Sequence, residues 1–127
     1  MENTMTLSSL GHTWILDLDG TLVVHNGHKR PEGDSWLPGA LEFLQSIPNE
    51  DMIVIITSRS EEYRSATEAF LVKHAIRFDH ILFSAPYGER IVLNDGKPSG
   101  LTTAYALNLE RDKGLPAEGL FSIDPEA

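Results

Sequence analysis

Two short apolar runs, each stopped by a polar residue, constrain the fold of this chain more than any other feature. The run 14–16 ends at Asp17, and the longer run 52–56, rich in β-branched side chains, ends at Thr57. Uninterrupted apolar runs of this length are typical of strands that are covered on both faces, and such strands belong to parallel sheets. The sequence therefore predicts an α/β fold with a Rossmann-like, three-layer arrangement and a mostly parallel sheet.

Amphipathic segments separate these runs, as helices would. A helix is predicted over residues 37–47, with Pro38 in its first turn and apolar side chains at helical spacing (Ala40, Phe43, Leu44 and Ile47). A second helix is predicted over residues 61–74, and the pattern Ser58-x-x-Glu61 before it is typical of a capping box.

The second half of the sequence gives further strand candidates. Strands are predicted over residues 81–83 and 91–93, and the latter run ends at Asn94 and Asp95. Residues 103–109 fit either a strand or a helical turn, and their alternation favours a strand. Residues 121–123 form either a last short strand or an unpaired tail.

Composition restricts the classes of function. The chain has 127 residues, 10 Lys and Arg against 19 Asp and Glu, a net charge of −9, and no cysteine. One domain over residues 1–127 is expected, with a loose segment at 1–12. The acidic balance argues against binding of extended nucleic acid, and cysteine chemistry is excluded. No run reaches the ~20 apolar residues of a membrane span, and residues 1–12 lack the pattern of a secretory leader, so a cytoplasmic protein is expected.

Polar residues follow three of the predicted strands. They are Asp17 and Asp19 after the first run, Thr57, Ser58 and Arg59 after the second, and Asn94 and Asp95 after residues 91–93. Ligands bind beyond the carboxyl ends of the strands in an open parallel sheet, so all three groups are expected at one edge.

The first of these groups carries the clearest chemistry. Asp17 and Asp19 alternate along an extended chain and therefore project to the same side. Two adjacent carboxylates are costly unless a cation lies between them, and Mg²⁺ prefers such oxygen ligands. The alternative is a strand end followed by an ordinary Asp-Gly turn at Gly20.

The order of these motifs resembles the haloacid dehalogenase superfamily of phosphotransferases. Residues 15–22, which read ILDLDGTL, resemble its first motif, an apolar strand followed by DxDGT. Residues 55–59 (IITSR) resemble its second motif, and residues 91–95 (IVLND) resemble its fourth. The likeness covers most of the chain.

The resemblance implies a role for each matched residue. Asp17 would attack phosphorus and form an aspartyl-phosphate, and Asp19 would act first as general acid and then as general base. Thr57 would donate its hydroxyl to a phosphate oxygen, aided by the backbone N–H of Ser58. Arg59 is either a phosphate or substrate clamp or an exposed residue of the first helical turn.

Magnesium is the cofactor that the resemblance implies. Its ligands would be Asp17, the backbone carbonyl of Asp19 and the pair Asn94 and Asp95, where the family often has two acids. The third-motif cation is either Lys97 or Arg90. Lys97 is preferred, because Arg90 precedes its predicted strand and is therefore expected at the opposite edge of the sheet.

The spacing between motifs leaves no room for a cap domain. Residues 22–35 contain the turn dipeptide Asn26-Gly27 and fit the small flap of the superfamily. The chain thus resembles the capless branch, whose open sites take large phosphate esters or borrow a lid through a homo-oligomer. The polar and aromatic flap residues are either leaving-group contacts or a polar tip with Trp36 packed beneath it (His25, His28, Lys29, Arg30 and Trp36).

Two substrate classes follow from narrower likenesses. Residues 93–101 resemble small bacterial phosphatases of capsule and surface-polysaccharide synthesis, which implies a sugar or polyol phosphate. Residues 57–59 resemble the second motif of polynucleotide phosphatases, which implies a nucleotide or polynucleotide end. A non-catalytic phosphate-binding module is the alternative outside enzymes, and a phosphotransferase or mutase is a weaker one, because no cap excludes water.

Overall fold

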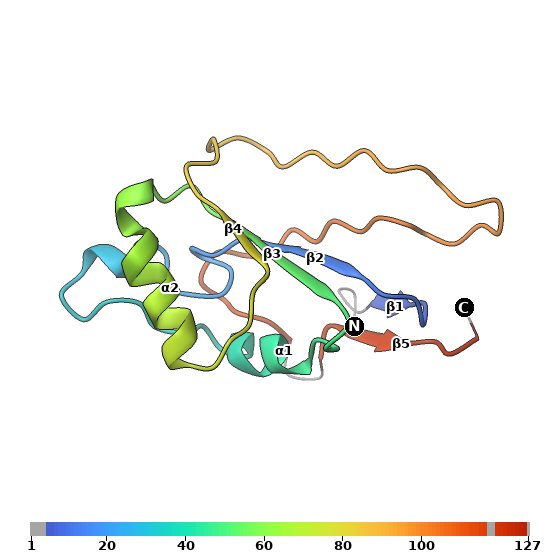
Figure 1. The fold of residues 1–127 in the computed structure, drawn as a ribbon, viewed down its shortest axis with the longest axis horizontal. Helices are drawn as coiled ribbons and strands as arrows, with labels where there is room; N and C mark the ends of the chain where they lie inside the picture. The colour runs from blue at the N-terminus through green and yellow to red at the C-terminus, as the bar shows by residue number, and fades with distance from the viewer. Residues whose placement is uncertain (1–4, 117–118, 127) are drawn as a thin grey trace.

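Three parallel strands form the centre of the fold in the computed structural model, which describes residues 5–116 and 119–126 (Figure 1). They are β2 (Thr13–Leu16), β3 (Met52–Ile56) and β4 (His80–Leu82), in the order β2-β3-β4. All three were predicted within one residue at each end, and their pairing is parallel as predicted. Apolar runs with abrupt polar ends therefore located this sheet correctly.

A second, two-stranded sheet joins distant parts of the chain. Strand β1 (Met5–Leu7) pairs in parallel with β5 (Phe121–Ile123). Of the two alternatives left open for residues 121–123, the structure shows the short strand. The prediction of a loose segment over 1–12 is wrong for residues 5–7, because Met5 and Leu7 alternate with Thr6 and are buried in the core. Residues 1–4 lie outside the described part.

The two main helices begin later than the sequence predicts. Helix α1 (Ala40–Ser46) starts only after Gly39, whose φ of 78° is left-handed, so Pro38 precedes the helix. Helix α2 (Arg64–Lys73) follows a 3₁₀ turn, η2 (Glu61–Tyr63).

The predicted capping box at α2 does not form. Ser60, not Ser58, stands at the N-cap of the 3₁₀ turn, and the Ser58 hydroxyl donates a hydrogen bond to the carbonyl of Pro86 instead. The capping-box spacing selects Ser58, but the helical segment begins two residues later, after Ser60.

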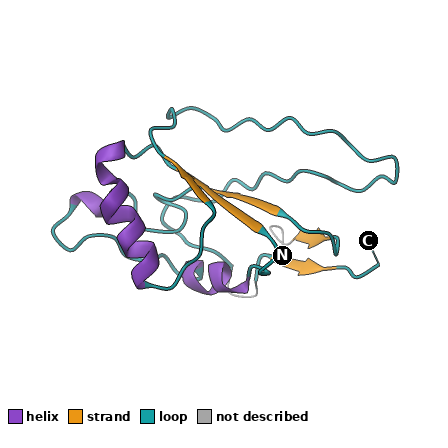
Figure 2. Ribbon diagram, viewed as in Figure 1, coloured by secondary structure: helices purple, strands orange, loops and turns teal. Residues whose placement is uncertain are grey.

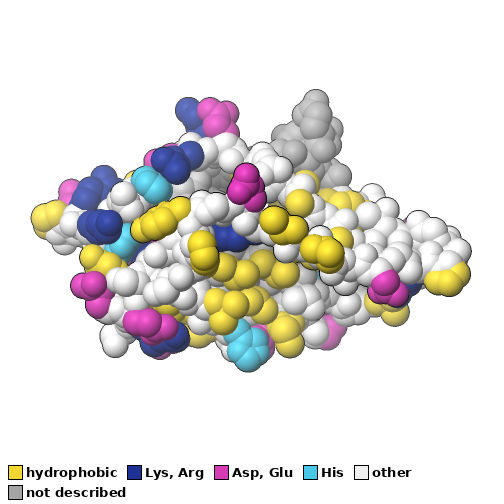
Figure 3. Space-filling model, turned by 90° about the horizontal axis from the view of Figure 1, so that it is seen from above, with side chains coloured by type: hydrophobic (Ala, Val, Ile, Leu, Met, Phe, Trp, Pro, Cys, Tyr) yellow, Lys and Arg dark blue, Asp and Glu magenta, His cyan; other side chains and the backbone are white. Residues whose placement is uncertain are grey.

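One face of the central sheet is packed and the other is open. Trp14, Ile53 and Ile55 point into the core, where Trp14 meets Phe43 of α1 edge-on with 5.4 Å between ring centroids. Side chains of the opposite face remain largely exposed (Ile15, Met52 and Leu82). The three-layer arrangement expected from the sequence is therefore not confirmed in the described residues. Figure 3 shows hydrophobic side chains at the surface.

Residues 84–112 form a long irregular excursion, which we call the arm (Figures 1 and 2). The predicted strand over 91–93 is wrong, because Ile91 and Leu93 are 80% and 87% exposed and unpaired. A parallel strand after β4 would need a crossover of roughly a dozen residues or more, and only residues 83–90 are available. The favoured strand over 103–109 does not form either, although Leu107 and Leu109 pack against the core at alternate positions.

A small flap follows β2, as the sequence predicts. Residues 23 and 36 form an antiparallel bridge, and the backbone N–H of Val24 donates to the carbonyl of Ser35. Between them lies a 3₁₀ turn, η1 (Gly27–Lys29), preceded by Asn26 with a left-handed φ of 60°. In the described chain, no helix is long and apolar enough to cross a membrane.

Candidate active site

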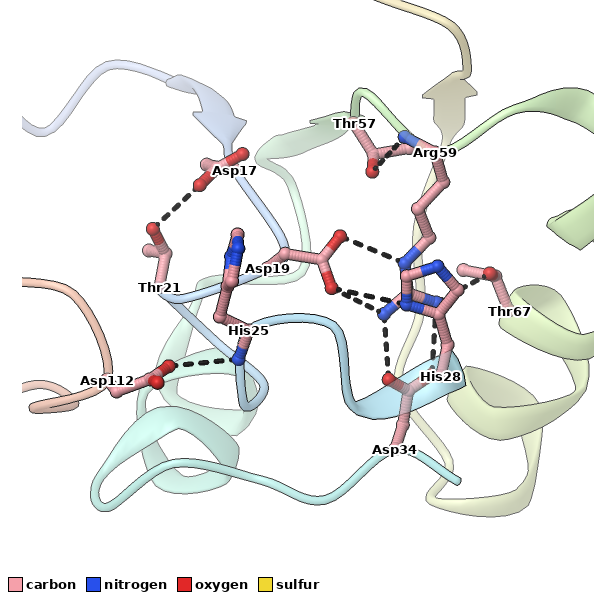
Figure 4. Close-up of polar contacts among 10 residues, drawn as sticks. All are labelled: Asp17, Asp19, Thr21, His25, His28, Asp34, Thr57, Arg59, Thr67 and Asp112. Carbon is pink, nitrogen blue, oxygen red and sulfur yellow. Dashed lines mark hydrogen bonds and ion pairs between the residues drawn. The ribbon is translucent and has the colours of Figure 1, made fainter. Parts of the chain in front are cut away.

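The carboxyl edge of the central sheet brings the first two predicted motifs together (Figure 4). Asp17 directly follows β2 and Thr57 directly follows β3, and the parallel pairing of these strands places both residues at one edge. The chain then turns sharply at Gly20, whose φ of 82° is left-handed. A side chain here would be strained by this backbone conformation and would lie close to the flexible side chain of Arg111, so the conformation favours glycine.

Asp17 presents an accessible carboxylate at this edge. Its side chain is 39% exposed, and Oδ2 accepts a hydrogen bond from the hydroxyl of Thr21 at 2.9 Å. Nη1 of Arg90 lies 3.4 Å from Oδ1. A positioned carboxylate with a guanidinium beside it can receive an anionic group at the open side of the edge.

The structure thus places Arg90, not Lys97, beside Asp17. The expectation that Arg90 lies at the opposite edge is wrong, because the chain leaves β4 at the carboxyl edge and residues 84–90 stay there before the arm runs outward. Lys97 is exposed, and its carbonyl accepts a hydrogen bond from the N–H of Gly100 in a turn of the arm.

Asp19 faces away from Asp17 and binds Arg59 (Figure 4). Both carboxylate oxygens accept hydrogen bonds from the guanidinium, Oδ2 from Nε at 3.0 Å and Oδ1 from Nη2 at 2.9 Å. Asp34, in the flap, accepts two more, from Nη1 and Nη2. Nη1 also donates to the hydroxyl of Thr67 on α2.

Arg59 is therefore a buried cross-link between three segments rather than an exposed helix residue. Its five N–H donors all find acceptors. Burial alone would lower the pKa of Arg59, but the hydrogen bonds to Asp19 and Asp34 outweigh it and raise the pKa above its usual value. In this arrangement Arg59 has no donor left for a substrate phosphate.

His28 lies against this ion-pair cluster without a hydrogen-bond partner. Its side chain is 5% exposed, and among the described residues neither ring nitrogen makes a hydrogen bond. Nδ1 is 3.6 Å from Oδ1 of Asp19, and the ring meets Tyr63 edge-on. Burial, followed by the charge of Arg59, lowers the pKa of His28, so the imidazole is neutral at pH 7.

Other predicted site residues lie nearby with local roles. Thr57 is buried, and its hydroxyl oxygen accepts a hydrogen bond from the N–H of Arg59 at 3.1 Å. The Ser58 hydroxyl donates a hydrogen bond to the carbonyl of Pro86 in the arm. His25 stands between Asp17 and Asp19 in Figure 4, and its backbone N–H donates to Asp112.

Asn94 and Asp95 are placed elsewhere, on the outer part of the arm. The amide of Asn94 donates to the carbonyl of Thr103, and the Thr103 hydroxyl donates to the carbonyl of Asp95. Both residues are exposed. The four residues predicted to hold magnesium are therefore not brought together in this structure, and the site does not fit that ion as it stands.

A pocket of about 530 Å³ opens between the flap and α2. Trp36 packs on Phe70 with 4.9 Å between ring centroids, and both residues line the pocket together with His28 and Asp34. Packing of Trp36 beneath the flap was one of the two roles that the sequence left open. The volume lies within the range of small-molecule sites.

Sequence reasoning missed Asp34 and Thr67. Asp34 lies in a polar flap segment without any motif, and Thr67 lies within an amphipathic helix. Both bind Arg59, 25 and 8 residues away respectively, and no spacing rule connects these positions. The sequence did offer one indication, which is Arg59 itself: a cation at the end of a strand can pair with nearby carboxylates, here those of Asp19 and Asp34.

Comparison with known proteins gives one limited likeness. No protein-family model matches the sequence, and no curated protein gives a significant match. Among solved structures, a chain of a structure described as the Pnkp1/Rnl/Hen1 complex is similar, with 27% identity and a TM-score of 0.50 over 65% of this chain. The chain spans 31% of that larger chain, so the likeness concerns one part of it.

Proposed function

We propose that this protein is a phosphohydrolase that cleaves a phosphate monoester through a covalent intermediate on Asp17. One observation carries the proposal: an exposed carboxylate at the carboxyl end of β2, oriented by Thr21, with the guanidinium of Arg90 beside it. The position is the one where open parallel sheets bind ligands. The resemblance of residues 15–22 and 55–59 to motifs of the haloacid dehalogenase superfamily supports the same class of chemistry.

The reaction would proceed in two displacements at phosphorus. An oxygen of Asp17 forms a bond to phosphorus as the bond to the ester oxygen breaks, and the departing oxygen takes up a proton. Water then attacks phosphorus, releases inorganic phosphate and restores Asp17. Arg90 would bind the equatorial phosphoryl oxygens, where its fork offsets the negative charge that gathers during transfer.

Thr57 and Asp19 have defined tasks in this proposal. The Thr57 hydroxyl accepts from Arg59 and so keeps its own proton available for a phosphate oxygen. Asp19 would supply and then recover the proton of the leaving oxygen. That task requires its carboxylate to leave Arg59 when substrate binds, because two hydrogen bonds from a guanidinium favour the ionised form.

Magnesium is proposed as the cofactor on the family resemblance alone. The ion would supply charge neutralisation between Asp17 and the substrate phosphate. Asn94 and Asp95 would have to approach Asp17 to complete its ligands, and we therefore assign no step to it.

The substrate is proposed to be a small phosphate ester. The likeness of residues 57–59 to the second motif of polynucleotide phosphatases favours a nucleotide or a polynucleotide end, whereas the likeness of residues 93–101 favours a sugar or polyol phosphate. The net charge of −9 disfavours a long nucleic acid. We also propose that the protein is cytoplasmic and that a second copy of the chain supplies a lid over the open site.

The second candidate is a phosphate-binding module without turnover. Two observations favour the binding module. Arg59 donates hydrogen bonds to both carboxylate oxygens of Asp19, and Asp95 lies on the arm, away from the carboxyl edge of the sheet. Retention of Asp17 and its orientation by Thr21 favour the enzyme.

Phosphate release from a panel of nucleotide, sugar and polyol phosphates tests the proposal. Wild type is assayed with magnesium and with chelator beside Arg90→Gln and Lys97→Gln, which remove the two candidate cations. We expect metal-dependent release that falls in Arg90→Gln and is retained in Lys97→Gln. No release from any ester by the folded wild type would leave the binding module as the function.

A further inference from the structure

Three potential metal ligands converge beside Arg59 from separate segments. Asp19 follows β2, His28 lies in the 3₁₀ turn η1, and Asp34 lies on the returning side of the flap. One ligand atom from each residue lies within 4.8 Å of the other two. In the part of the chain that the structure describes, no other group of three His, Asp or Glu side chains is so close.

His28 provides the observation that points to a missing ligand. A buried imidazole normally has a partner for at least one nitrogen, because desolvated polar atoms are costly without one. Only 5% of the side chain is exposed, and neither ring nitrogen has a hydrogen-bond partner among the described residues. Nδ1 faces Asp19 at 3.6 Å, which is too long for a hydrogen bond.

That separation suits two ligands of one metal ion. Ligands at the usual 2.0–2.2 Å from a tetrahedral zinc ion are about 3.4 Å apart. The 3.6 Å between His28 Nδ1 and Asp19 Oδ1 is therefore close to the separation of two ligands of one such ion.

Arg59 does not use up the two carboxylates. A carboxylate has about four lone-pair sites, and Asp19 and Asp34 each accept two hydrogen bonds from Arg59. Each therefore keeps lone pairs for a metal, while Arg59 fixes its orientation as outer partners of metal ligands commonly do.

The charge of the cluster also favours a cation. Two carboxylates against one guanidinium leave one unbalanced negative charge in a mostly buried site. A divalent ion would more than offset this negative charge, leaving a net charge of +1, and would give the imidazole its partner.

We propose that Asp19, His28 and Asp34 form a binding site for a first-row transition-metal dication of the zinc class. One imidazole and two carboxylates select such ions over magnesium, which prefers oxygen ligands alone. Three protein ligands leave a coordination position for water or a substrate oxygen. The site differs from the magnesium site that the family resemblance implies, and its existence does not depend on phosphatase activity.

Titration of Co²⁺ into the full chain tests the proposal, because Co²⁺ adopts zinc sites and gives a visible absorption spectrum. We expect one equivalent to bind with the spectrum of a mixed nitrogen and oxygen site. His28→Gln removes the imidazole without breaking a hydrogen bond and should weaken binding at least tenfold. His80→Gln, at the exposed start of β4, is the matched control and should bind as wild type does.

Two results would overturn the proposal. One is no binding of Co²⁺ or Zn²⁺ by the wild type at micromolar concentration, and the other is equal affinity in wild type and His28→Gln. Asp34→Asn provides a second variant, with its fold verified by circular dichroism, and should also lose affinity. Magnesium-dependent phosphate release is measured separately, so failure of the phosphatase proposal leaves this test unaffected.

Discussion

The two edges of the central sheet each hold a buried carboxylate beside a histidine, but they differ in completeness. At the amino edge, Asp51 accepts hydrogen bonds from the backbone N–H and Nδ1 of His12 and from Nε1 of Trp14. The other nitrogen of His12 contacts the carbonyl of Ser8 at 2.9 Å. At the carboxyl edge, His28 has no such partner and the ion-pair cluster keeps an excess negative charge.

The amino edge contributes mainly to stability, whereas the carboxyl edge holds the residues of the candidate site. Both oxygens of the Asp51 carboxylate have partners within the chain, and their hydrogen bonds hold β2 against the segment before β3. The carboxyl edge leaves Asp17 accessible and His28 unsatisfied, which is the condition of a site that a ligand completes. Removal of the Asp17 carboxylate should therefore affect activity more than folding, and removal of the Asp51 carboxylate should affect folding more than activity.

The largest effect is expected from Asp17→Asn. The amide is nearly isosteric but cannot act as the nucleophile, so turnover should fall at least ~1000-fold. The free energy of unfolding should change by less than about 0.5 kcal/mol, because the side chain is partly exposed. Phosphate release and urea denaturation measure the two quantities, and turnover near the wild-type rate would remove Asp17 as nucleophile.

Arg59→Met should give the largest loss of stability. Removal of the guanidinium leaves the carboxylates of Asp19 and Asp34 without their counter-charge, which costs about 3–5 kcal/mol for a buried pair. Arg64→Met on α2 is the control, since its ion pairs are exposed and screened by solvent and should contribute little to stability. Similar denaturation midpoints for the two variants would contradict the assignment of Arg59 as a cross-link.

Asp51→Ala should destabilise the fold without affecting the active site. The change leaves the donors of His12 and Trp14 unsatisfied, and we expect a loss of about 1–3 kcal/mol. KM and kcat should stay at wild-type values wherever the variant is folded. A selective loss of kcat would show that the two edges are coupled.

The amino edge should also make stability depend on acid pH. Burial would raise the pKa of Asp51, but hydrogen bonds from Trp14 and His12 outweigh it and lower the pKa below its usual value of 3.8. The folded state then binds fewer protons than the unfolded state, so the contribution is present above pH ~4 and is lost as pH falls through the lower folded value. Denaturation midpoints between roughly pH 5 and pH 2 should vary less in Asp51→Ala than in wild type.

The smallest effect is expected in the arm. Leu93→Ser removes an apolar side chain that is already in water, so the free energy of unfolding should change by less than about 0.5 kcal/mol. Leu107→Ser, whose side chain packs against the core, is the comparison and should cost more. Equal losses would mean that Leu93 is buried in solution.

The sequence predicted those parts of the molecule that depend on local pattern. The runs 14–16 and 52–56 became strands because apolar character, branching and abrupt polar ends all agree. Residues 91–93 have the same local character, yet they form no strand, because the connection from β4 is too short for a parallel crossover. Local pattern does not report that constraint.

The candidate site divides in the same way. The position of Asp17 followed from its strand, whereas the contacts of Asp19 and Arg90 span 40 and 73 residues and arise only in the folded chain. Lys97 was preferred to Arg90 because a strand was assumed between them, and without that strand the argument reverses.

The pairing of β1 with β5 makes the arm a tether rather than a scaffold. Residues on both sides of it meet independently: Met5 aligns with Phe121, and the N–H of Leu115 donates to the carbonyl of Pro38. A protease that cuts after Arg90 would leave two fragments joined by these contacts and by a shared core. Contacts that do not pass through the arm therefore hold the last strand of the chain against the first.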